Sequence, residues 1–145
     1  MKGHYKLILL IAISLASCSP KLKDEYNGQI ILDICDLPNH INETVILKAT
    51  YSGMEEYWSL NSVKSKKCSA ELLVNLDFEE NYKIPHNFEK MLTKIHNSYW
   101  NSYLTILAKG KYENSNPNGY GHLGTKKSRF LISEIINIEL IKREK

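Results

Sequence analysis

The first 18 residues constrain this chain more than any other segment, because their layout is that of an export signal. Lys2 and Lys6 form a short basic start, and an almost wholly apolar run follows from Leu7 to Leu15. Two small residues and then Cys18 come directly after that run. The run is too short to span a bilayer, which takes about 20 apolar residues. We therefore predict that residues 1–17 are a signal peptide and that the rest of the chain folds outside the cytoplasm.

The sequence Leu15-Ala16-Ser17-Cys18 resembles the lipobox of bacterial lipoproteins. The resemblance implies cleavage before Cys18, diacylation of its thiol and acylation of the new amino terminus. More than one acyl chain gives stable attachment, since each buried methylene contributes about 0.8 kcal/mol. Ser19 rather than Asp follows the cysteine, which by analogy with Gram-negative sorting favours the outer membrane. The predicted location is the bacterial cell envelope, and the alternatives are a plain signal peptide or a membrane anchor.

The part that remains after cleavage is long enough for one domain with one core. We expect a lipid-anchored polar tether over residues 18–28 and a single β-domain over residues 29–145. Two of the 19 Lys and Arg residues, Lys2 and Lys6, leave with the signal, so the remainder nearly balances the 16 Asp and Glu residues. A near-neutral chain has no broad electrostatic attraction to nucleic acid, and no nucleic-acid partner is expected.

Two cysteines, Cys35 and Cys68, remain once Cys18 is lipidated. Outside the cytoplasm such a pair is most simply a disulfide. It would close a loop of about 34 residues and stabilise the domain by about 3.7 kcal/mol in the chain-entropy model. A metal pair and a redox pair are the alternatives, although the close C-x-x-C spacing that favours them is absent.

The pattern of apolar residues predicts strands with one helix among them. Phe88, Met91, Leu92 and Ile95 form one helical stripe, and Asn87 is placed to cap it. Gly110 permits a bulge or bend in the strand that contains it. The predicted order is a strand-like run over 29–35, a turn or short helix over 36–43, strands over 44–51, 56–63 and 70–78, a helix over 87–96, and strands over 99–112 and 129–141.

Three strands, a helix and two further strands fit a mainly β fold, an OB-like five-stranded Greek-key barrel with one helix between strands three and four. The helix would close one end of the barrel. The run through Cys35 would form an added flap, which the disulfide would fasten to the turn before the third strand. A different β-sandwich and a split α+β sheet remain as alternatives.

Several stretches together resemble a group of small exported bacterial lipoproteins. These stretches are Ile34-Cys35-Asp36-Leu37, residues 44–51, residues 55–60, Cys68, and Gly121-His122-Leu123 before the last strand. The resemblance implies an OB-like domain with a cysteine bridge. It carries no catalytic residue, because no activity is settled for the group. The chain departs from the group at Asn42-Glu43, where Gly-Lys is usual.

The strongest candidate for a ligand site is Tyr120-Gly121-His122, within a long turn over residues 114–124. In an OB barrel this turn joins strands four and five beside the usual ligand face. Trp58 and Tyr112 are added as aromatic side chains on barrel strands, which suit contacts with protein or glycan. The alternative for His122 is a purely local role, in which it bonds to the backbone and locks the turn.

No sequence motif indicates catalysis, a metal or a cofactor. The histidines are scattered, and neither H-E-x-x-H nor G-x-S-x-G occurs. We expect no catalytic residue, no metal site and no cofactor.

The function predicted from these observations is a non-enzymatic, lipid-anchored binding module of the cell envelope. It would be held to the membrane by its lipid and would bind a protein or a glycan through barrel aromatics and the 114–124 turn. One alternative is a structural lipoprotein that only docks into an envelope complex. A metal-dependent hydrolase is the other alternative, and it requires a second ligand or a carboxylate close to His122.

Overall fold

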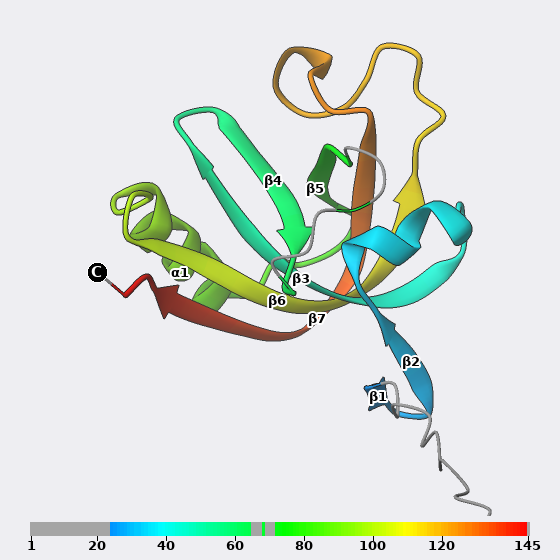
Figure 1. Cartoon of the computed structure of the whole chain (residues 1–145), viewed down its shortest axis with the longest axis horizontal. Coiled ribbons are helices and arrows are strands. Elements are labelled where there is room, and N and C mark those ends of the chain that lie inside the picture. Colours follow the sequence, from blue (N-terminus) through cyan, green and yellow to red (C-terminus); the bar gives the residue numbers. More distant parts are fainter. Residues whose placement is uncertain (1–23, 65–67, 69–71, 145) are drawn as a thin grey trace, which may run out of the picture.

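The computed structural model describes residues 24–64, 68 and 72–144, and it consists mainly of β-strands (Figure 1). The predicted signal peptide and Cys18 lie outside these residues. In chain order the elements are β1 (Glu25–Tyr26), β2 (Gln29–Leu32), the 3₁₀ helix η1 (Ile34–Asn39), β3 (Thr44–Met54), β4 (Tyr57–Ser62), β5 (Val74–Phe78), α1 (His86–His96), β6 (Ser102–Glu113), the 3₁₀ turn η2 (His122–Gly124) and β7 (Ser128–Lys142).

Across the described ranges 24–64, 68 and 72–144, none of the helices has the length and apolar character needed to traverse a bilayer.

Five strands form a closed barrel in the spatial order β3, β4, β5, β7, β6, and β6 pairs back with β3. β5 and β7 run parallel, whereas the other neighbouring barrel strands are antiparallel. α1 lies in the chain between the third and fourth strands of the barrel. This arrangement confirms the predicted mainly β, OB-like fold.

The barrel core follows from alternation along the strands. Successive residues of β6 are buried and half-buried in turn, so that Leu104, Ile106 and Ala108 point into the barrel. α1 adds Phe88 and Ile95 to this core, and both are fully buried. The predicted apolar stripe therefore packs on the barrel, since Met91 and Leu92 are partly buried against the same cluster.

The start of α1 differs from the prediction. The N-cap is Pro85, which offers no side-chain hydrogen bond, and the helix begins at His86. Asn87 lies inside the first turn, where its Oδ1 accepts a hydrogen bond from the backbone N–H of Phe88 at 3.0 Å. The order Pro-His-Asn explains the difference: Pro85 has the fixed φ of −63° and an extended ψ, which suit the residue that precedes a helix.

The flap consists of β1, β2 and η1, and it projects from the barrel at its β1–β2 end (Figure 1). β2 pairs with β3 in parallel, with Ile31 opposite Ile46. Residues 25–26, which were predicted to belong to the tether, instead form strand β1. The turn between β1 and β2 explains this, because Asn27 and Gly28 both have positive φ and Asn-Gly is the preferred pair in a tight hairpin.

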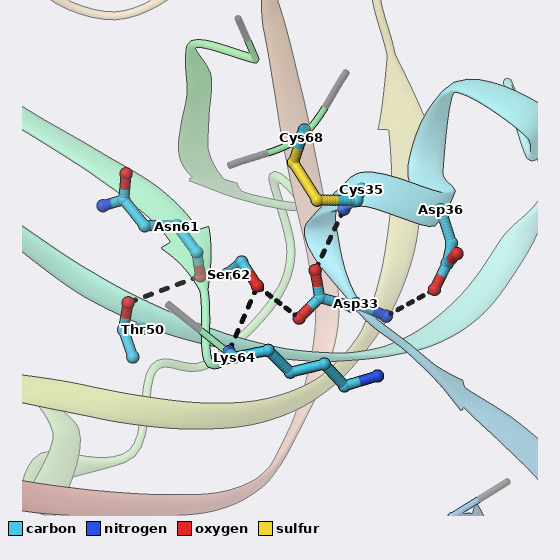
Figure 2. Close-up of a disulfide and its surroundings, with 8 residues drawn as sticks. All are labelled: Asp33, Cys35, Asp36, Thr50, Asn61, Ser62, Lys64 and Cys68. Atoms are coloured by element: carbon cyan, nitrogen blue, oxygen red, sulfur yellow. Dashed lines mark hydrogen bonds between the residues drawn. A yellow bond between two sulfur atoms is a disulfide. The ribbon is translucent and has the colours of Figure 1, made fainter. Parts of the chain in front are cut away.

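The predicted disulfide between Cys35 and Cys68 is confirmed, with a Cα–Cα distance of 5.1 Å (Figure 2). It fastens η1 to the segment between β4 and β5. Asp33 reinforces the junction: its carboxylate caps η1 by accepting from the N–H of Cys35 at 3.1 Å, and it also accepts from the hydroxyl of Ser62 in β4 at 2.9 Å. The flap is thereby tied to the segment after β4 by the disulfide and to β4 itself by a buried carboxylate.

Gly110 in β6 stands where the register between β6 and β7 shifts, as predicted from the glycine. A Cβ at this position would lie 2.8 Å from a ring carbon of Phe130. The barrel can close tightly here only because Gly110 has no side chain.

β3 was predicted to end at Tyr51 but continues to Met54. Gly53 lies within the strand and packs against the backbone of Trp58, where a Cβ would come 2.6 Å from Cα of Trp58. The chain reverses two residues later, at Glu55 with φ 50°. Gly53 therefore allows β3 and β4 to pack closely, and it is not part of the turn between them.

Removing the disulfide tests how much the flap contributes to stability. We expect the double variant Cys35→Ala, Cys68→Ala to lower the free energy of unfolding by roughly 2–4 kcal/mol, because the unfolded chain is no longer constrained. Urea denaturation of the wild type and the variant measures the difference. The wild type in reducing agent is the control and should lose a similar amount, whereas two free thiols in the non-reduced protein by mass spectrometry would contradict the bridge.

Candidate functional site

Two connections that flank the ligand face of OB barrels meet in this structure: the β3–β4 turn and the β6–β7 loop. His122 Nε2 in the loop lies 2.8 Å from Glu56 Oε2 in the turn. The ring of Tyr57 also approaches the His122 ring edge-on, with centroids 6.2 Å apart. His122 therefore joins the two connections, beyond the local role in its own turn.

The contact between His122 and Glu56 alone does not hold the loop, because these side chains are 39% and 66% exposed. Pairs of this kind contribute only about 0–1 kcal/mol. Hydrogen bonds within the loop supply further order. The backbones of Tyr120 and Lys126 form a two-way bridge at 2.9 and 3.1 Å, and the side chain of Asn116 donates to the carbonyl of Gly119 at 2.8 Å.

Arg129 holds the β6–β7 loop in place through Tyr120. Its guanidinium contacts Glu113 at 2.8 Å and Asp77 at 3.4 Å, and it lies 5.3 Å from the centre of the Tyr120 ring. Burial opposes the charge of Arg129, but the hydrogen bonds and charges of Glu113 and Asp77 outweigh it and raise the pKa of the guanidinium. The network links β5, β6 and β7 beneath the loop.

Three of the four predicted ligand residues are core side chains. Tyr112, Trp58 and Tyr120 are each 8% exposed or less. The indole N–H of Trp58 donates to the carbonyl of Glu55 at 2.8 Å, and the hydroxyl of Tyr120 accepts from the N–H of Asn116 at 3.1 Å. These rings support the turn and the loop from the protein interior. Of the four predicted ligand residues, only His122 lies at the surface.

The structure also brings apolar side chains to this place that the sequence did not indicate. Leu123 is 83% exposed and has φ 52°, a left-handed conformation that is unfavourable for leucine. Met54 and Tyr57, which are cross-strand partners at the hairpin tip, are 58% and 51% exposed. We call Met54, Glu56, Tyr57, His122 and Leu123 the rim. The sequence around Leu123 gives no signal that its side chain is exposed, because the residues that surround it in space decide its exposure.

A separate cavity of about 280 Å³ lies on the outer face of the barrel, where sequence analysis predicted no site. We call it the groove, and it shares no residue with the rim. Its lining comes from β3, β4, β6 and the segments after β4 and β7, namely Thr50, Ser52, Ser62, Val63, Tyr103 and Arg143.

The other three histidines among the described residues make local contacts. His40 and His86 lie 2.7 and 3.4 Å from Glu43 and Glu89, each three residues along the chain. His96 packs on Trp58, and partial burial there lowers its pKa. In the part of the chain that the structure describes, no three His, Cys, Asp or Glu side chains gather in a way that would hold a metal ion.

Comparisons of the chain with protein-family models, with curated proteins and with solved structures return no match.

The packing of the core near the site can be tested at alkaline pH, because Tyr51 is a titratable side chain within it. The ring of Tyr51 lies 5.4 Å from that of Trp58. Burial, aided by the charge of Asp77, raises the pKa of Tyr51 from 10.0 to about 12. The unfolded state therefore ionises first, and stability is lost as the pH rises from 10 to about 12. At pH 11 this linkage costs the wild type about 1.4 kcal/mol, a loss that Tyr51→Phe should not show.

The measurement is the free energy of unfolding in urea at pH 9 and pH 11. Tyr57→Phe is the matched control: its ring is half exposed, so this variant should keep the full alkaline loss. An equal loss in the wild type and in Tyr51→Phe would contradict the assignment.

Proposed function

We propose that the chain is a lipid-anchored, non-enzymatic binding module of the bacterial cell envelope, and that its rim contacts a partner protein. The observation that carries the proposal is Leu123, a highly exposed apolar side chain on a left-handed backbone within a braced loop.

A left-handed conformation costs an L-residue roughly 1–2 kcal/mol, and exposure of Leu123 brings no compensating burial within the chain. Strain of this kind collects at sites of function, where the surrounding structure maintains it. Full burial of a leucine in a partner would contribute about 1.5–3 kcal/mol. Contact with a partner would therefore offset the cost that the isolated chain bears.

The make-up of the rim supports a protein as the partner. Met and Tyr are enriched in protein interfaces, and a polar edge around an apolar centre is their usual plan. Met54, Tyr57 and Leu123 supply the apolar centre, and Glu56 with His122 supplies the polar part. Because the loop is already ordered by its own hydrogen bonds, binding would lose less conformational entropy.

One contact favours a second candidate, a hydrolase: the carboxylate of Glu56 lies within hydrogen-bonding reach of His122. A catalytic pair of this type needs a partly dehydrated setting to stabilise developing charge. Both side chains are well exposed, so the binding function is the better supported of the two.

Membrane attachment is tested with Cys18→Ser in the native host. We expect this variant to leave the membrane fraction, because the thiol that would carry the diacyl group is absent. Ser19→Ala is the matched control and should remain attached. Immunoblots of membrane and soluble fractions measure the outcome, and retention of Cys18→Ser in the membrane would contradict lipid anchoring.

Partner binding is tested with Leu123→Gly, which removes the apolar side chain and relieves the backbone strain. We expect stability in urea to be unchanged or raised by up to about 1 kcal/mol, while the amount of envelope partner recovered after crosslinking falls at least tenfold. A loss of binding without a loss of stability would separate function from folding.

Trp100→Ala is the matched control, since it removes another large exposed side chain that lies outside the rim. It should keep the partner. Equal recovery with the wild type and Leu123→Gly would contradict the proposal, and recovery of one partner in fixed stoichiometry through every wash would favour the structural alternative.

A further inference from the structure

The groove is lined mainly by polar side chains, and these fall into two groups by the hydrogen bonds they already make. Four of its residues carry hydroxyl groups and one carries a guanidinium, whereas Val63 alone is apolar. Which of these groups can donate and which can accept decides what the groove can bind.

One group offers hydrogen-bond donors. The guanidinium of Arg143 lies 5.8 Å from the centre of the Tyr103 ring, and no carboxylate among the described residues forms an ion pair with it. The backbone N–H of Arg143 donates to the carbonyl of Asn101 at 2.7 Å, which fixes the chain at this point. Ser52 adds a donor: its Oγ accepts from the side-chain amide of Asn61 at 3.3 Å, so its own proton can point elsewhere.

The other group offers acceptors. The hydroxyl of Ser62 donates to the carboxylate of Asp33 at 2.9 Å, and the hydroxyl of Thr50 donates to the carbonyl of Asn61 at 3.3 Å (Figure 2). Both protons are therefore taken by acceptors within the protein. The Oγ of Ser62 also accepts from the backbone N–H of Lys64 at 3.1 Å, so one of its lone pairs remains for a ligand, and the hydroxyl oxygen of Thr50 can accept as well (Figure 2). Asp33 also places a negative charge behind Ser62, which disfavours an anion at that position.

We propose that the groove binds a small acidic saccharide, with its carboxylate on Arg143 and its hydroxyl groups on Ser52, Thr50 and Ser62. A guanidinium pairs with a carboxylate through two parallel hydrogen bonds. Sugar hydroxyls both donate and accept, as the mixed lining requires. A simple anion would use only the donors near Arg143, and a neutral sugar would leave that cation without a partner.

The groove is small, so it can take no more than a small ligand. Its volume of about 280 Å³ lies just below the range of roughly 300–1,000 Å³ that small-molecule sites span. The groove shares no residue with the rim, so a saccharide and a protein partner would not compete for the same side chains.

The test is an NMR titration of the ¹⁵N-labelled full-length chain in non-ionic detergent micelles. The probe is glucuronic acid, and glucose and inorganic phosphate are titrated separately. We expect glucuronate at low millimolar concentration to shift the backbone amides of the groove residues, and the other two probes to shift them much less. No shift with glucuronate, an equal shift with glucose, or an equal shift with phosphate would each overturn the proposal.

Variants then assign the contact to a side chain. Arg143→Gln should raise the Kd for glucuronate at least tenfold, while Lys142→Gln, which removes the same charge from the neighbouring residue outside the groove, should stay within twofold of the wild type. Arg143 is exposed, so the substitution is compatible with folding. Equal weakening by both variants would show general charge attraction and overturn the site. Leu123→Gly should leave the Kd unchanged, which separates this site from the rim; a changed Kd in that variant would overturn their independence.

Discussion

Pairing between β3 and β6 closes the barrel, and the rest of the molecule is arranged around it. The two strands are antiparallel from Thr44 opposite Lys111 to Tyr51 opposite Leu104. β3 also pairs with β2 along its first half and with β4 along its second half. A strand with partners at both edges cannot shift its register without disturbing every neighbour. The flap, the β3–β4 turn and the groove all take their positions from this strand.

At the junction of the flap with the barrel, one set of contacts both stabilises the fold and sets the hydrogen-bonding properties of the groove. Cys35 and Cys68 constrain the chain covalently, and Asp33 caps η1 while it accepts from Ser62. The same hydrogen bond commits the Ser62 proton and leaves an acceptor facing the groove. A carboxylate that satisfies the backbone of the flap therefore also sets the polarity of a neighbouring surface.

The rim and the groove differ in chemistry because they are built in different ways. The rim is presented by a turn and a loop, whose inner aromatic rings and Arg129 hold exposed apolar side chains in place. The groove is built from the outward side chains of strands, which are polar because the inward ones supply the core. A small barrel can thus carry two separate surfaces without a cleft through its core.

The sequence by itself determined the order of the barrel strands and the helix, the barrel class, the disulfide and the helical stripe. Periodicity and turn residues act locally, and a leftover cysteine pair leaves few alternatives. Only the tertiary structure decided which aromatic rings are buried. Tyrosine is a residue type that is common on binding surfaces, but the side chains of Tyr112 and Tyr120 point into the protein because of their positions in the strand and the loop. It also decided that His122 meets Glu56 and that Arg143 lies over Tyr103, since these pairs are far apart in the chain and come together only when the barrel closes.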